Sequence, residues 1–139
     1  MDHPQLDAAL QLARAHGRAS KALDTALAAH HGIGASDFAL LNALAEAPRE
    51  RAKPVDLARL LSMTASGVTR ALLPLEKIGI VERRKDERDA RISYAALTEA
   101  GRRVIEQARV TAELTAAGLF SRLSVGQTRQ LQRLLEDIA

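Results

Sequence analysis

The sequence predicts a mainly α-helical fold in which one short pair of strands interrupts a series of helices. Three observations support this prediction. Ala, Leu and Arg dominate the composition, which suits helices. Apolar residues recur at helical spacing over most of the chain, whereas residues 80–97 form two extended segments around a charged turn. The predicted order is α-α-α-α-β-β-α-α, in a single chain of 139 residues.

The first two helices are predicted over residues 4–31 and over the phrase that follows Ser36. Pro4 suits a first helical turn, while Gly32 and Gly34 suit a helix end. We expect Ser36 to cap the second helix and Ala47-Pro48 to end it. The apolar stripe of this second helix consists of Phe38, Leu41 and Leu44.

Two shorter helices joined by a tight turn are predicted next. Pro54 begins the first, and Thr64 is the expected N-cap of the second. The side chains of this second helix that should face the core are Val68, Ala71, Leu72, Leu75 and Ile78. The side chains on its opposite face are Ser66, Arg70, Leu73 and Lys77. Such a pair of helices is a helix-turn-helix.

Pro74 lies inside the second of these helices, where it lacks a backbone donor and crowds the carbonyl of Arg70. We expect a bend there, with a polar half of the helix before it and a core-packing half after it. A strict break of the helix is the alternative, and it would leave a shorter polar half.

A hairpin and two final helices complete the predicted fold. Gly79 ends the helix, and the strands cover residues 80–85 and 91–97. Thr98 caps a long helix that runs to about Phe120. The last helix begins at Ser124, where S-V-G-Q forms a capping box, and it carries Leu131, Leu134, Leu135 and Ile138. The whole is a winged helix-turn-helix within a helical frame.

The net charge of +3 is unevenly distributed. Residues 49–91 hold 11 Lys/Arg against 7 Asp/Glu, whereas the rest of the chain holds 9 against 10. A basic region flanked by near-neutral helices is typical of a nucleic-acid surface, although a solvated face rich in arginine is the alternative. Because aromatic residues, on which single-stranded nucleic acids stack, are limited to Phe38, Tyr94 and Phe120, duplex DNA is favoured.

Other classes of protein are disfavoured. The chain has no cysteine, which excludes disulfides and thiol-based switches. It has no apolar run of membrane-spanning length and no signal-peptide core, so we expect a cytoplasmic protein without a membrane partner. We find no nucleophile–base grouping, phosphate loop or metal pattern, and therefore expect neither an enzyme nor a cofactor. The histidines, none with zinc-site spacing, are His3, His16, His30 and His31.

A helix followed by a basic hairpin fits duplex DNA, because the major groove admits a helix and a narrow minor groove attracts arginine. The candidates for reading bases are Thr64, Ser66, Gly67, Thr69 and Arg70. The alternative is that Thr64 only caps its helix and Arg70 is only solvated. The candidates for phosphate contact are Arg83, Arg84 and Lys85, of which only some can face DNA since strand side chains alternate. Weaker candidates are Arg49, Arg51 and Lys53.

The turn of the hairpin carries both signs of charge. Asp86 and Asp89 are unsuited to phosphate contact, and we expect them to pair with neighbouring arginines, Arg91 among them. These three residues would then brace the hairpin.

In this order and at this spacing, four phrases resemble the MarR family of bacterial transcriptional regulators. They are D-F-A-L-L-N-A-L-A-E, P-V-D-L-A-R-L-L-S-M-T-A-S-G-V-T-R, L-E-K-I-G-I-V-E-R with D-E-R-D-A-R and L-T-E-A-G, and L-S-V-G-Q-T-R-Q-L-Q-R-L-L-E-D-I. The resemblance implies a homodimer, with a DNA-binding domain over residues 35–97. Residues 1–34 and 98–139 would form the dimerisation region.

The resemblance also implies a pseudo-palindromic operator, with Arg88 at the wing tip entering the minor groove. It implies a repressor that a small ligand releases, and the histidines are candidates for lining the family's ligand cleft. The alternative function is a winged-helix module that binds protein rather than DNA, which the modest net charge would suit.

Overall fold

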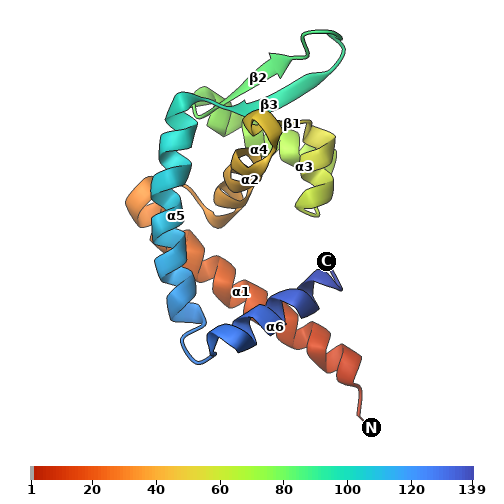
Figure 1. Cartoon of the computed structure of the whole chain (residues 1–139), viewed down its shortest axis with the longest axis vertical. Coiled ribbons are helices and arrows are strands. Elements are labelled where there is room, and N and C mark those ends of the chain that lie inside the picture. The colour runs from red at the N-terminus through yellow and green to blue at the C-terminus, as the bar shows by residue number, and fades with distance from the viewer. Residues whose placement is uncertain (1) are drawn as a thin grey trace.

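The computed structural model describes residues 2–139 and confirms the mainly helical, winged architecture (Figure 1). Its elements are α1 (Pro4–His31), α2 (Ala35–Glu46), the 3-10 turn η1 (Pro48–Glu50), β1 (Arg51–Ala52), α3 (Pro54–Leu60), α4 (Ala65–Lys77), β2 (Val81–Lys85), β3 (Ser93–Leu97), α5 (Glu99–Leu119) and α6 (Val125–Glu136). Within residues 2–139, no helix combines the length and the apolar character needed to cross a membrane.

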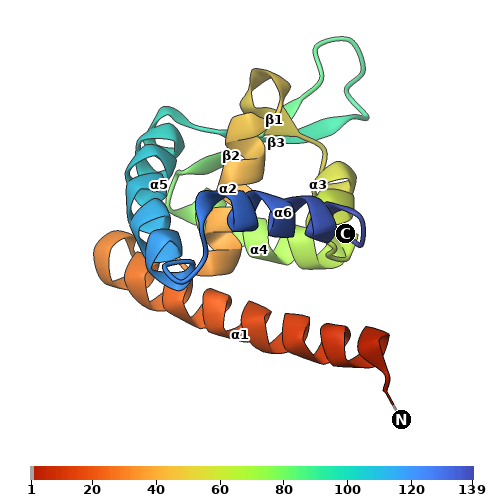
Figure 2. The ribbon, with the colours of Figure 1, turned by 60° about the horizontal axis from the view of Figure 1, so that its bottom comes forward.

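The helices are arranged around two ends of the molecule. At one end α2, α3 and α4 gather beside the sheet, and α5 runs from there to the other end, where it packs against α1 (Figure 1). Figures 1 and 2 both show the N-terminal part of α1 extending away from the rest of the chain. The hairpin of β2 and β3 projects at the opposite end, which leaves its turn free to reach a partner.

The sheet is antiparallel in the order β1-β3-β2. The sequence predicted β2 and β3 but not β1, whose two residues pair with Ala95 and Ala96 of β3. Arg49 and Glu50 have φ values of 59° and 53°, a left-handed conformation that is uncommon outside glycine. This turn brings the chain alongside β3, and two residues are too few to show strand periodicity.

The core lies where α2, α4, α5 and the end of α1 meet the sheet. Its fully buried large side chains are Leu27, Leu40, Leu41, Leu44, Leu57, Val68, Leu72, Val81, Leu97 and Ile105. Of the residues of α4 expected in the core, Val68, Leu72 and Leu75 are buried, but Ile78 is 66% exposed. Because α4 ends at Lys77, the chain turns at Ile78 and places Ile80 in the core instead.

Three of the four predicted helix caps are confirmed. The hydroxyls of Thr64, Thr98 and Ser124 each accept a hydrogen bond from a backbone N–H three residues on, at 3.0–3.1 Å. The prediction for Ser36 is wrong, because α2 begins at Ala35 with Gly34 as its N-cap. The carboxylate of Asp37 accepts the Gly34 N–H at 3.0 Å, which supplies the cap from inside the helix.

The start of α5 is fixed tightly to the segment that joins α4 to β2. The hydroxyl of Thr98 donates to the carbonyl of Gly79 at 2.6 Å, and the Thr98 N–H donates to the carbonyl of Ile80. A Cβ placed on Gly101 would lie 2.0 Å from the Ile80 carbonyl oxygen, closer than any real contact. Glycine at this position therefore allows α5 to approach the backbone that leads into the wing.

Candidate nucleic-acid interface

The polar start of α4 presents short hydroxyl side chains that bond locally and one exposed cation, Arg70. The hydroxyl of Thr64 accepts the Gly67 N–H, and that of Thr69 donates to the Ala65 carbonyl at 3.1 Å. The exposed side chain of Ser66 touches only the Thr64 hydroxyl, at 3.3 Å. Arg70 is exposed and forms no ion pair with any residue of the range 2–139. The sequence candidates thus cluster, but Thr64 and Thr69 already have local hydrogen bonds.

Pro74 does not break the helix. The α4 helix continues from Ala65 through Pro74 to Lys77, so the alternative of a strict break is wrong. The expected division into a polar half and a core-packing half does not hold, because the buried Val68 and Leu72 precede Pro74 and the buried Leu75 follows it. Arg70 is exposed on the same helix.

The three cations of β2 differ in their surroundings. Arg83 donates to Glu76 of α4 at 2.8 Å, and Arg84 pairs with Glu82 of its own strand. Lys85 forms no ion pair within the described chain. Arg84 lies opposite Tyr94 of β3, so it shares the Tyr94 face of the sheet, whereas Arg83 and Lys85 share the other. Lys85 is therefore the best-placed phosphate candidate of the three.

The turn of the wing is held by two aspartates in different ways. One Asp86 carboxylate oxygen accepts the backbone N–H groups of Arg88 and Asp89, at 3.1 and 3.0 Å. Asp89 forms a bidentate pair with the Arg91 guanidinium, at 3.0 and 2.9 Å. The expected arginine pairing thus occurs at Asp89 but not at Asp86, which binds the backbone instead. The Arg88 side chain is exposed and has no acidic partner among residues 2–139.

The Arg91 side chain, followed by the Arg91 backbone N–H, lowers the pKa of Asp89 below its ordinary value. The same hydrogen bond raises the pKa of Arg91. A carboxyl whose folded pKa is lowered contributes its stabilisation above its unfolded pKa and loses it as the pH falls through the folded value. The Asp89–Arg91 brace is therefore lost only in acid, below the pKa of a free aspartate.

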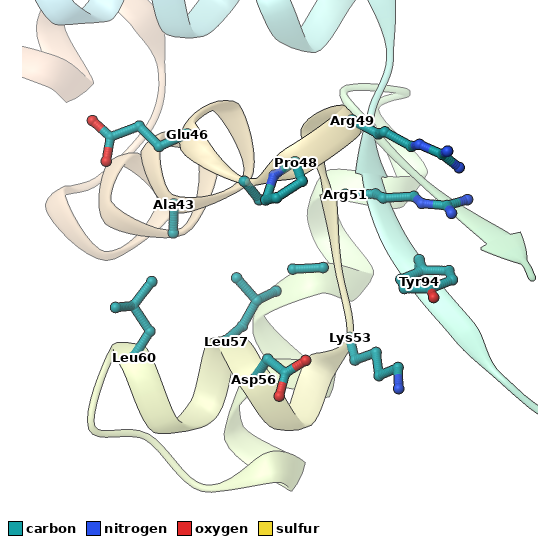
Figure 3. Close-up of a pocket in the computed structure, with 12 residues that line it drawn as sticks. Ala43, Glu46, Pro48, Arg49, Arg51, Lys53, Asp56, Leu57, Leu60 and Tyr94 are labelled. Atoms are coloured by element: carbon teal, nitrogen blue, oxygen red, sulfur yellow. The ribbon is translucent and has the colours of Figure 1, made fainter.

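Two residues that the sequence did not single out organise the base of the wing. Glu76 accepts a hydrogen bond from Arg83. The Arg51 guanidinium lies over the ring of Tyr94, with its carbon 4.2 Å from the ring centroid (Figure 3). The Tyr94 hydroxyl also donates a long hydrogen bond of 3.5 Å to Asp86. The only sequence signal for Tyr94 was that it is the single tyrosine of the chain.

The remaining basic and imidazole candidates lie apart from the wing tip. Arg49 is exposed, and Lys53 precedes α3 as its N-cap residue. His31 contacts Thr111 of α5 at 2.7 Å, which joins α1 to α5. No three His, Cys, Asp or Glu side chains gather as a metal site within the described residues.

Comparison with known sequences identifies the family of the central region. The sequence model described as the MarR family matches residues 31–92. The chain is 29% identical over 107 residues to the HTH-type transcriptional repressor Rv2887 of Mycobacterium tuberculosis. That alignment covers 77% of this chain and 76% of the relative. The family match thus contains α2, α3, α4, β2 and the turn of the wing, and it ends just before β3.

Solved structures of similar fold extend the likeness to the terminal helices. Sco3205, a MarR family transcriptional regulator from Streptomyces coelicolor in complex with DNA, superposes with a TM-score of 0.87 at 26% identity. The alignment covers 99% of this chain and 90% of that one. CouR from Rhodococcus jostii RHA1, bound to p-coumaroyl-CoA, has the same fold with a TM-score of 0.87 at 23% identity, over 99% and 95% of the two chains.

Proposed function

Because the chain belongs to the MarR family of bacterial transcriptional regulators, we propose that it is a homodimeric repressor that binds a specific duplex operator and is released by a small ligand. The observation that best supports this proposal is the combination of an exposed polar start of α4 with a braced wing. Within residues 2–139, the Arg88 side chain of this wing has no acidic partner. The DNA complex of Sco3205 supports the choice of duplex DNA as the partner.

Each part of the interface has a role in this proposal. The start of α4 enters the major groove, where Ser66 and Arg70 reach base edges or phosphates. The wing follows the backbone, Lys85 contacts phosphate, and Arg88 enters the adjacent minor groove. Thr64, Gly67 and Thr69 shape the helix start so that its backbone approaches the DNA closely.

The terminal helices supply the argument for a homodimer. None of the side chains of α6 is buried, and the N-terminal half of α1 is exposed throughout. Large apolar side chains nevertheless lie exposed on α1, α5 and α6, namely Leu6, Leu10, Leu12, Val110, Leu114, Leu119, Val125 and Leu134, and Ile138 just after α6 is exposed as well. We propose that a second copy covers them. A two-fold dimer then requires a pseudo-palindrome with half-sites about one helical turn apart.

Release by a small ligand is proposed on two grounds. The solved CouR structure holds p-coumaroyl-CoA, a small molecule, on the same fold. The chain has no cysteine, so a thiol-oxidation signal is excluded and a bound ligand is the simplest remaining signal.

A titration against salt separates this function from the alternative of a protein-binding module. Association with a duplex selected from a random pool should weaken steeply as salt rises, because phosphate contacts release counterions. An apolar protein interface would lack that dependence. Affinity that stays constant with salt, or the absence of any selected duplex, would favour the protein-binding alternative.

The wing is tested by Arg88→Ala, which should weaken operator binding by about 1–3 kcal/mol in a fluorescence-anisotropy titration. Arg122→Ala, which removes an exposed arginine from the loop between α5 and α6, is the matched control and should bind as the parent does. Helicity and molecular mass should be the same in all three proteins. Unchanged affinity in Arg88→Ala would contradict the minor-groove role.

A further inference from the structure

One leucine lies on the face of α4 that is proposed to meet DNA. Leu73 is 45% exposed and is not part of the hydrophobic core. It shares a stripe of α4 with Ser66, Arg70 and Lys77, all of which are exposed. Leu75, two residues on, is buried, and two residues turn a helix by about 200°. The Leu73 side chain therefore points away from the core.

Two cations flank Leu73 on this stripe. Arg70 precedes it by three residues and Lys77 follows it by four, so the three side chains are neighbours on one face of α4. Neither cation forms an ion pair within residues 2–139. Pro74, the residue after Leu73, is exposed as well. The outer face of α4 thus carries an apolar spot between two positive charges.

These charges indicate what kind of surface can cover Leu73. An apolar protein surface would remove Arg70 and Lys77 from water without an acidic partner, which is costly. The terminal helices, where a second copy is proposed to bind, lie toward the other end of the molecule (Figure 1). The major groove of DNA is lined by phosphates, which suit the cations, and it presents the C5-methyl groups of thymines to apolar side chains. Duplex DNA therefore matches the whole stripe.

The spacing along α4 brings Leu73 within reach of the bases. It lies three residues beyond Arg70, which is about 4.5 Å along the axis at a rise of about 1.5 Å per residue. Successive base pairs are about 3.4 Å apart. Leu73 would therefore face a base pair that is one or two steps from the one beside Arg70.

We propose that Leu73 contacts the C5-methyl group of a thymine in the major groove and so contributes to the choice of operator. This contact rests on the proposed function, because it requires that α4 enter the major groove. Leu73 would favour thymine over cytosine at that position, since C5 of cytosine carries only hydrogen. Because leucine has no charge, the contact should leave the salt dependence of binding unchanged.

The contact is tested by removing each partner separately. In a duplex selected from a random pool, each thymine is replaced in turn by deoxyuridine, in both half-sites at once, which deletes only the methyl group. For the parent, one such replacement should weaken binding about fourfold to fifteenfold in anisotropy titrations, as expected for one or two buried methyl groups. For Leu73→Ala, the same replacement should change the affinity by less than about twofold.

Ile78→Ala is the matched control, because Ile78 is another exposed apolar residue and lies just after α4. It should respond to deoxyuridine as the parent does, and all three proteins should have the same helicity. 5-Methylcytosine gives an independent check, since its methyl group occupies the same place in the groove as that of thymine. At the identified position the parent should bind it more tightly than cytosine, whereas Leu73→Ala should bind both equally.

Two results would overturn the contact while leaving the proposed function in place. One is a duplex that the parent binds with no dependence on any thymine methyl group. The other is a methyl effect that is equally large in Leu73→Ala. If the chain instead selects no duplex at all, the proposed function itself fails and the contact fails with it.

Discussion

At the wing tip, the negative side chain of Asp86 lies beside a surface that is proposed to contact phosphates. Asp86 accepts two backbone N–H groups, and both belong to the turn that carries Arg88. An aspartate that bonds to the backbone two and three residues on fixes a tight turn in the manner of a cap. The placement of the Arg88 cation therefore depends on a neighbouring anion.

This role predicts that loss of the Asp86 carboxylate weakens DNA binding, although removing a negative charge near DNA would by itself strengthen it. Asp86→Ala removes a negative charge near DNA but releases the turn, so operator affinity should fall about threefold to tenfold, roughly 0.6–1.4 kcal/mol. Glu87→Ala removes the same charge from the next residue, which forms no hydrogen bond within the described chain. It should bind as well as the parent or better. Stronger binding by Asp86→Ala in anisotropy titrations would show that the turn needs no brace.

The pair of Asp89 with Arg91 can be tested by measuring the pKa of the Asp89 carboxyl group. Because the Arg91 guanidinium lowers the pKa of Asp89, Arg91→Ala should raise the pKa of Asp89 toward that of a free aspartate. Carboxyl ¹³C NMR titrations of the two proteins measure the difference. An identical midpoint in both would mean that the pair does not persist in solution.

Among the elements, α5 depends most on close backbone contact. A methyl group at Gly101 would meet the Ile80 carbonyl, so Gly101→Ala should destabilise the fold by about 1–3 kcal/mol or more in urea unfolding. Gly118 of the same helix has nothing within 4 Å of an added Cβ. Gly118→Ala should therefore match or stabilise the parent by up to about 1 kcal/mol. Equal stability of both variants would contradict the close approach.

The sequence predicted those elements whose signals are local. Thr64, Thr98 and the Ser124–Gln127 box mark helix starts because a cap involves only three or four residues. The prediction failed at Ser36, because Gly34 is the N-cap and the Asp37 carboxylate supplies the hydrogen bond. It missed β1, whose pairing partners lie more than forty residues away in β3.

The contrast between local and long-range contacts also explains which parts of the candidate site could be predicted from the sequence. The bracing pair of Asp89 and Arg91 is two residues apart and was expected from the pattern of charges. The pair of Arg83 with Glu76 joins a strand to a helix, and the stacking of Arg51 on Tyr94 joins two strands. Such contacts depend on the assembled fold, so the sequence alone does not reveal them.

For the whole molecule, the exposed apolar residues of the terminal helices predict the oligomeric state. Leu114 of α5 is 72% exposed, so Leu114→Glu should raise the dimer dissociation constant at least about tenfold, or 1.4 kcal/mol. Leu60→Glu is the matched control, because Leu60 is 69% exposed but belongs to the winged part of the chain. Sedimentation equilibrium should find it dimeric like the parent. A dimeric Leu114→Glu, or a monomeric parent, would refute the proposed interface.

The tight contact of Gly101 with Ile80 has a mechanical consequence for the proposed dimer. Because α5 is clamped to the wing base and reaches the terminal helices after 21 residues, it acts as a lever about 30 Å long. A tilt of about 10° at one end would displace the other by roughly 5 Å over that length. In the proposed two-fold dimer such a tilt would change the separation of the two copies of α4. A small rearrangement between the winged part and the terminal helices would then be enough to move the two α4 helices out of register with successive major grooves.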